Sequence, residues 1–216
     1  MKFSRLTKIS LLLAAFFFLD KVLAFARQVL IARQFGLSAE LDAFNVANNI
    51  PDLLFALISG GALAIAFIPV LSEVLTRSGQ KPAWLLFSRI ANLAFLVTVA
   101  LAILVAIFAA PMVQAELGIA PGFTVAQQHL VIHLMRLNLV ATIIFSISGL
   151  VMAGLQANQH FLLPAMAPLF YNIGQILGVG ILSPEQGYRL GPLTLPAYGL
   201  GVQGLVYGVI IGAVLH

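Results

Sequence analysis

The chain has 216 residues, of which 61% are hydrophobic and only 8% are charged, and it contains no cysteine. A soluble domain is about a quarter charged, so this composition excludes a globular protein with a polar surface and indicates an integral membrane protein. The formal net charge of +4 is small and spread along the chain, which favours basic loops beside a membrane over a nucleic-acid surface, so we expect no nucleic-acid partner.

Six apolar segments are long enough to cross a membrane, which takes about 20 residues in a helix. The second segment carries Pro51 and Pro69 and is therefore expected to be long and kinked. Together the segments predict an all-α integral membrane fold with a single transmembrane domain over residues 1–216. In chain order, the six predicted transmembrane helices cover residues 9–35, 42–76, 83–113, 125–157, 161–182 and 195–215.

The charges outside these helices predict how the bundle is oriented across the membrane. The N-terminal tail carries Lys2, Arg5 and Lys8, and the second connection carries Arg77 and Lys81. The first connection, GLSAELD, is acidic, and the third, QAELGIAPGFT, has no basic residue. Because basic loops stay on the cytoplasmic side, the N-terminus is predicted to be cytoplasmic, and six spans return the C-terminus to the same side.

The first predicted helix contains charges inside an apolar stretch, FFFLDKVLAFARQVLIAR at residues 16–33. Ionisable residues are expensive inside a membrane and are usually functional. Asp20 and Arg27 lie seven residues apart and share a helix face, while Lys21 and Gln28 share the neighbouring face. Lys21 and Arg27 are about 9 Å apart along the axis, so they predict a pair of cations in an anion-binding cavity. The alternative is that these charges pair internally and only hold helices together.

The second predicted helix carries a polar stripe in which Asn45, Asn48 or Asn49, and Asp52 recur at three- and four-residue spacing. Pro51 removes a backbone donor and can open the helix locally. The stripe predicts polar groups that support the same cavity, with ordinary interhelical hydrogen bonding as the alternative for the asparagines. For Asp52 the alternatives are a position facing the extracellular vestibule or an ion pair with a basic neighbour.

The fourth predicted helix places His129, His133 and Arg136 on one face. An HxxxH pair can bind a metal, but no third ligand is evident, so core or interface histidines are favoured and no metal site is predicted. Arg136 has no local acid and is predicted to face the same cavity or a partner acid. Asn172 and Gln175 in the fifth predicted helix are isolated, and we interpret them as packing contacts.

Several ordered motifs resemble one known family. Residues 23–73, LAFARQVLIARQFGLSAELDAFNVANNIPDLLFALISGGALAIAFIPVLSE, resemble the first two helices of the MurJ/MviN lipid II flippases, within the multidrug/oligosaccharidyl-lipid/polysaccharide exporter superfamily. APGF at 120–123 and GLQANQHFLLPAMAPLFYNIG at 154–174 are similar to later parts of these flippases. Members have two lobes of six helices, so the resemblance implies that this chain is the N-terminal lobe of a two-lobe flippase fold. The chain ends inside the apolar run YGVIIGAVLH, which fits a missing C-terminal lobe as its partner.

The resemblance also implies a function and a set of site residues. Members flip an undecaprenyl-pyrophosphate-linked peptidoglycan precursor, lipid II, from the cytoplasmic to the outer leaflet by alternating access, for cell-wall synthesis. The implied location is the bacterial cytoplasmic (inner) membrane, with membrane lipids as further partners and the pyrophosphate near cavity arginines. The first essential arginine position of the family holds Lys21 here, and the second holds Arg27. Gln28 replaces the acid that follows, and Asp42 matches the aspartate that opens the second helix.

Two positions depart from the family pattern. The arginine after the family's PNLL motif is replaced by Phe55, and the acid of its AEGA motif is replaced by Gly60. One of three cationic positions is therefore lost, and Arg136 is a candidate for a compensating charge. We accordingly predict Arg27, Lys21 and Arg136 as the substrate-binding cations.

Other functions stay open at this point. No Walker loop, dinucleotide fingerprint, HExxH or GxSxG motif occurs, so we expect a transporter rather than an enzyme. No cofactor is expected, with coupling to the membrane potential or to a monovalent cation as an open alternative. The competing interpretations are a related polysaccharide-lipid or cation-coupled drug exporter, and a non-transporting truncated lobe that acts as a scaffold.

Overall fold

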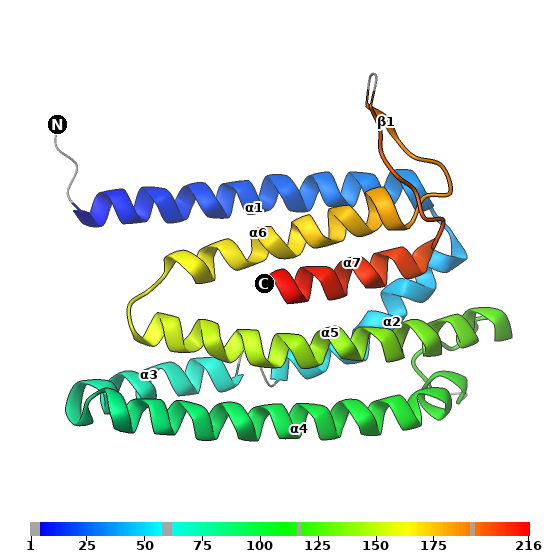
Figure 1. Cartoon of the computed structure of the whole chain (residues 1–216). Coiled ribbons are helices and arrows are strands. Elements are labelled where there is room, and N and C mark those ends of the chain that lie inside the picture. Colours follow the sequence, from blue (N-terminus) through cyan, green and yellow to red (C-terminus); the bar gives the residue numbers. More distant parts are fainter. Residues whose placement is uncertain (1–4, 58–61, 116–117, 191–192) are drawn as a thin grey trace.

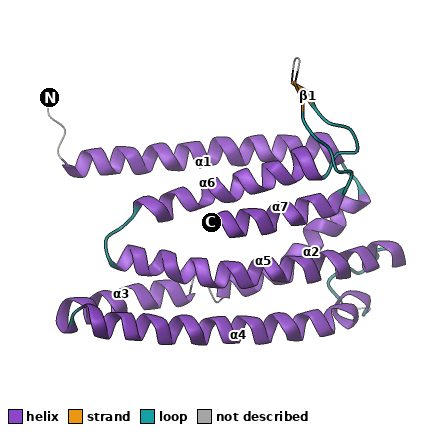
Figure 2. Ribbon diagram, in the orientation of Figure 1, coloured by secondary structure: helices purple, strands orange, loops and turns teal. Residues whose placement is uncertain are grey.

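The computed structural model describes residues 5–57, 62–115, 118–190 and 193–216, and these residues are almost entirely helical (Figures 1 and 2). Helices α1, α4, α5, α6 and α7 lie side by side, and α2 and α3 run one after the other in the same direction (Figure 1). The elements are α1 (Arg5–Phe35), α2 (Ala39–Phe55), α3 (Ala62–Ser78), α4 (Gln80–Gln114), α5 (Val125–Ala157), α6 (Leu162–Leu177), the π-helical turn η2 (Gly178–Leu182), β1 (Arg189–Leu190), β2 (Leu193–Thr194) and α7 (Val202–Leu215).

Several predicted helix boundaries are confirmed, and local chemistry explains them. The fourth predicted helix, 125–157, has the same bounds as α5. It begins with a capping box, in which Thr124 Oγ1 accepts a hydrogen bond from the backbone of Gln127 and the Gln127 side chain accepts one from the backbone of Thr124. Helix α1 ends where predicted, because Gly36 adopts a positive φ of 56°, which favours glycine after a helix.

The prediction of one helix over residues 42–76 is wrong, because α2 and α3 are separate helices. Pro51 and Pro69 do not divide it, since each lies inside one of the two helices. Gly60, the position where the family motif has an acid, lies outside the described residues.

The sixth predicted helix begins later than predicted, at Val202 instead of residue 195. Gly199 and Gly201 have positive φ angles, and the segment before α7 is held by hydrogen bonds to the end of η2 and the residues after it. The backbone N–H of Tyr198 donates to the carbonyl of Ile181 at 3.2 Å, and that of Gly201 donates to Ser183 at 3.0 Å. The short antiparallel pair of β1 and β2 is also not predicted from the sequence.

Helices α6 and α7 approach each other through glycines. A Cβ atom built on Gly178 would lie 2.7 Å from the Cα of Gly208, so no larger residue fits there without movement of the backbone. Gly174 faces Gly212 in the same way, and Gly204 lies against the start of the loop after η2. Such small-residue faces let membrane helices pack at close distance. This contact sets how near α7 lies to the rest of the bundle.

The connections alternate between the two ends of the bundle (Figure 1). The start of α1, the α3–α4 connection and the α5–α6 connection lie at one end, where Arg77 and Lys81 are found. The α1–α2, α4–α5 and α6–α7 connections lie at the opposite end. Among the described residues, α4, α5 and the continuous α6–η2 segment are long and apolar enough to cross a membrane, and α7 is apolar but shorter. A nearly all-helical fold is confirmed, whereas exactly six membrane spans are not.

Candidate functional site

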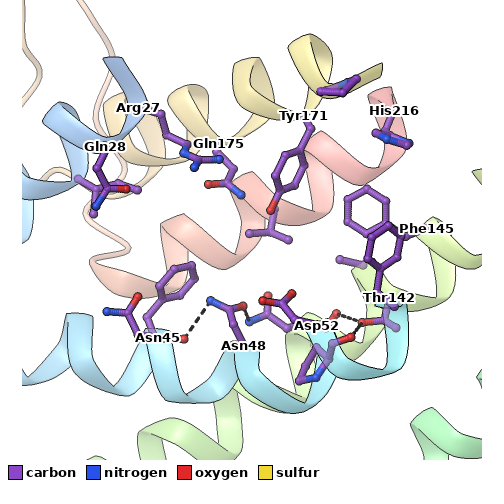
Figure 3. A pocket seen from close by; sticks show the side chains of 18 of the residues that line it. Arg27, Gln28, Asn45, Asn48, Asp52, Thr142, Phe145, Tyr171, Gln175 and His216 are labelled. Atoms are coloured by element: carbon purple, nitrogen blue, oxygen red, sulfur yellow. Dashed lines mark hydrogen bonds between the residues drawn. The ribbon is translucent and has the colours of Figure 1, made fainter. Parts of the chain in front are cut away.

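A polar cavity of about 460 Å³ lies between α1, α2, α5, α6 and α7 (Figure 3). The residues that line it are far apart in the sequence, and many of them have polar side chains. From α1 to α7 the lining residues are Arg27, Gln28, Ile31, Leu41, Phe44, Asn45, Asn48, Pro51, Asp52, Phe55, Asn138, Ala141, Thr142, Phe145, Pro168, Tyr171, Gln175, Val209 and His216.

Arg27 brings a cation to the cavity from α1. Its Nε atom is buried and has no hydrogen-bond partner among the described residues. No acid lies within 4 Å of it in that part of the chain. Gln28 from α1 and Gln175 from α6 line the cavity on the same side, with amide groups that can donate to oxygen (Figure 3). A buried donor without an acceptor is unfavourable unless a ligand or water supplies one, so Arg27 is suited to hold an anion.

The opposite side of the cavity is formed by α2 and α5 and carries oxygen atoms. Asn138 Nδ2 donates to Asn48 Oδ1 at 2.6 Å, which ties the two helices together. Thr142 Oγ1 donates to the carbonyl of Asn138 at 3.3 Å and lies 3.5 Å from the carbonyl of Pro51. Asp52 lies one residue further along α2, and Figure 3 shows it entering the cavity from the side opposite Arg27.

Asp20 and Lys21 lie outside the cavity. Asp20 is only 6% exposed and accepts a hydrogen bond from Asn172 Nδ2 of α6 at 2.8 Å. Lys21 pairs with Asp20 at 3.0 Å, and its side chain is 80% exposed. The prediction that Lys21 and Arg27 line one cavity together is therefore wrong for this structure. Lys21 shares its face of α1 with Gln28, which lines the cavity, but it lies about 10 Å nearer the start of the helix. The interpretation of Asn172 as a packing contact is confirmed by its bond to Asp20.

Arg136 does not line the cavity, so the prediction that it faces the cavity beside Arg27 is also wrong. Its Nε atom donates to the carbonyl of Ala106 in α4 at 3.0 Å, on an exposed face of α5 that it shares with His129 and His133. The reason is helical geometry. Asn138 follows Arg136 by two residues, about 200° around the helix, and Asn138 faces the cavity.

The other predicted polar residues divide between the cavity and the end of a helix. Gln28, Asn48 and Asp52 line the cavity. Asp42 is exposed in the first turn of α2, where a negative charge stabilises the helix N-terminus, and it does not line the cavity. Phe55, which stands where the family has an arginine, lines the cavity and packs against Phe145 at 5.2 Å between ring centroids.

Sequence reasoning did not identify Asn138, Thr142 and Tyr171, and it took Gln175 only as a packing contact. These four residues form two pairs, and the spacing within each pair is a sequence signal that could have identified them. Thr142 follows Asn138 by four residues, and Gln175 follows Tyr171 by four, which is the spacing of neighbours on one helix face. Inside an apolar helix, such a polar pair indicates a face that is turned away from lipid.

Comparisons with known proteins agree with one another. A family model described as lipid II flippase MurJ matches residues 31–216. A lipid II flippase MurJ of Burkholderia cenocepacia is 30% identical over 208 residues, which is 95% of this chain and 37% of that protein. A probable lipid II flippase MurJ of Buchnera aphidicola is 32% identical over 160 residues, which is 73% of this chain and 31% of that protein.

A solved structure is similar in fold. It is that of a lipid II flippase MurJ in an inward closed conformation, and the similarity has a TM-score of 0.73 and 25% sequence identity. It covers 95% of this chain and 40% of that one. This chain thus spans well under half the length of the proteins it matches. Because the family model covers all but the first thirty residues, the chain belongs to the lipid II flippase MurJ family.

Proposed function

We propose that this chain forms part of a flippase that moves lipid II across the bacterial cytoplasmic membrane by alternating access, for peptidoglycan synthesis. The observation that carries the proposal is the Arg27 guanidinium, which faces a polar cavity with a buried Nε that lacks an acceptor. The similarity to lipid II flippases, one of them solved in an inward closed conformation, supports the substrate and the mechanism.

The chemistry of Arg27 suits a pyrophosphate. A guanidinium presents a planar set of donors that binds phosphate oxygens in pairs, and charge-assisted hydrogen bonds of this kind are stronger than neutral ones. Gln28 and Gln175 add neutral donors beside it. A polyanionic head group cannot enter a low-dielectric membrane unaided, so a polar cavity with one cation lowers the barrier to its passage. Such a passage breaks no covalent bond, so the proposed activity is transport rather than catalysis.

Lys21 is proposed to act before Arg27 on the path of the head group. It precedes Gln28 by seven residues, which places it on the same face of α1 and about 10 Å nearer the helix start. Gln28 lines the cavity, and the Lys21 side chain is exposed at 80%. An exposed ammonium on the way to the cavity can attract a phosphate group from the cytoplasmic leaflet.

The proposed membrane arrangement has six spans, formed by α1, α2 with α3, α4, α5, α6 with η2, and α7. The alternating ends of the connections support it, and the basic residues Arg77 and Lys81 favour the cytoplasm for the end where α1 begins (Figure 1). A C-terminal lobe, which would complete the flippase fold, is the proposed partner of this chain.

A depletion-and-rescue experiment tests the proposal. The full-length gene is expressed in a bacterium whose own lipid II flippase is depleted, and growth and lipid II transport are measured. The wild-type gene should restore both, whereas Arg27→Ala should restore neither although the protein still inserts into the membrane. Arg136→Ala removes an arginine outside the cavity and should rescue like the wild type.

The outcomes separate the alternatives. Failure of the wild-type gene would exclude lipid II and leave the related exporters or a scaffold role. Full rescue by Arg27→Ala would show that the charges of α1 only hold helices together.

A further inference from the structure

The α2–α5 side of the cavity has more hydrogen-bond acceptors than donors. The amide of Asn138 donates to Asn48 Oδ1, and the amide of Asn48 donates to the carbonyl of Phe44 at 3.0 Å, so each amide group has one N–H engaged within the protein. Asn138 is only 1% exposed, and its Oδ1 atom has no hydrogen-bond partner among the described residues. A buried carbonyl oxygen without a donor is unfavourable, so this oxygen calls for a donor or a cation.

Three further oxygen groups lie beside Asn138. Thr142 Oγ1 directs its hydrogen to a backbone carbonyl, which leaves its lone pairs free to accept. The carbonyl of Pro51 lies 3.5 Å from the same hydroxyl. Asp52 follows directly, and no lysine, arginine or histidine lies within 4 Å of its carboxylate in the part of the chain that the structure describes. The four groups are all oxygen ligands, which hard cations prefer.

Pro51 adds to this excess of oxygen. Because proline has no backbone N–H, it cannot donate to the carbonyl of Ala47, which would otherwise receive a helical hydrogen bond. The carbonyl of Ala47 therefore lacks its helical donor in the turn that precedes Asp52.

The charges in the cavity favour a single positive charge at this place. Asp52 supplies one negative charge, which a monovalent cation neutralises. A divalent cation would leave an excess positive charge in a cavity that already holds the Arg27 guanidinium, and like charges repel. Arg27 and Asp52 enter the cavity from opposite sides, so an anion and a cation can be bound at the same time (Figure 3).

We propose that Asp52, Asn138, Thr142 and the Pro51 carbonyl form a binding site for a monovalent cation, with Na⁺ as the occupant. Under the proposed function, this cation and the pyrophosphate at Arg27 share one cavity. Each then stabilises the other electrostatically, so binding of one raises the affinity for the other by the same factor. The site thereby connects movement of the head group to the sodium gradient.

Sodium binding is measured on the purified full-length protein without lipid II. Thermal unfolding is recorded in NaCl and in choline chloride at equal ionic strength, and Na⁺ is titrated by calorimetry. The wild type should melt at a higher temperature in NaCl, because a ligand that binds only the folded state stabilises it. Asp52→Asn should remove this sodium-dependent increase, and Thr142→Val should weaken sodium binding about tenfold.

Matched variants keep the result interpretable. Thr142→Ser retains the hydroxyl and should bind sodium like the wild type. This control distinguishes loss of the hydroxyl ligand in Thr142→Val from poor folding of a variant at this position. Glu73→Gln removes a carboxylate that pairs with Arg77 outside the cavity and should leave sodium binding unchanged.

The proposal is overturned if the wild type shows no preference for Na⁺ over choline, as expected if water or Arg27 alone satisfies these oxygens. It is also overturned if Asp52→Asn and Thr142→Val keep the full sodium effect, which would place the ion elsewhere in the protein. Because no lipid is present, these results do not depend on whether the protein flips lipid II.

Discussion

Two hollows of similar size lie in this bundle, and their chemistry is opposite. The cavity between α1, α2, α5, α6 and α7 has a volume of about 460 Å³ and contains Arg27 and Asp52. The groove between α3, α4 and α5 has a volume of about 520 Å³ and is bordered mainly by apolar side chains, including Trp84 stacked on Phe87 at 5.5 Å. Volume alone therefore does not mark the candidate site. What distinguishes the polar cavity is that it is lined by buried polar atoms that lack hydrogen-bond partners among the described residues, such as Arg27 Nε and Asn138 Oδ1.

The largest expected effect comes from filling each hollow in turn. Thr142→Trp places a large ring in the polar cavity and should abolish lipid II transport, because the head group loses its space. Leu155→Trp fills the apolar groove and should leave transport near the wild-type value. Both variants are compared by transport assay after equal membrane insertion is verified. Loss of transport in Leu155→Trp would break the distinction between the two hollows.

A smaller effect separates the two cations of α1. Arg27→Lys keeps the charge but loses the planar set of donors, and transport should fall about tenfold. Lys21→Arg keeps an exposed charge beside Asp20 and should be tolerated. Transport rates of the two variants in the full-length protein test this. Equal rates would mean that only net charge matters, and a larger loss in Lys21→Arg would move the binding site out of the cavity.

The smallest effect on transport, but a measurable effect on stability, is expected in the apolar core that lies beside the groove between α3, α4 and α5. Leu150 is 2% exposed in the core that α3, α4 and α5 form, and Leu150→Ala should destabilise the folded protein by about 2–5 kcal/mol. The neighbouring Val151 is 43% exposed, so Val151→Ala is a control with little expected effect. Thermal unfolding measures both variants. If transport by Leu150→Ala fell by more than the loss of folded protein explains, the core of α3, α4 and α5 would take part in transport.

The sequence predicted some features because they depend on short-range physics. Apolar length and the cap at Thr124 define α5, and the charge of Arg27 inside an apolar helix marks the cavity. The positions of Lys21 and Arg136 could not be predicted in the same way, because each depends on which part of its helix is covered by another helix. Burial of that kind is a tertiary property, and a charge count does not contain it.

Two errors have a related cause. The stretch before Val202 is apolar enough to be read as helix, yet its backbone N–H groups donate to residues at the end of η2. The prolines of residues 42–76 predict a kink in one long helix, although both lie within helices and the chain divides between them. In each case hydropathy correctly located the apolar segment but did not specify its backbone conformation.

The bond between Asp20 and Asn172 has a consequence for how the protein is made. The two residues are separated by 152 positions, so α1 leaves the ribosome long before α6 exists. At about 5–20 residues per second, the carboxylate waits roughly 8–30 s for its amide partner. During that time Lys21 is its nearest source of charge neutralisation. Because a buried carboxylate is unfavourable without its hydrogen-bond partner, α1 can reach its final packing in the bundle only after α6 has been made.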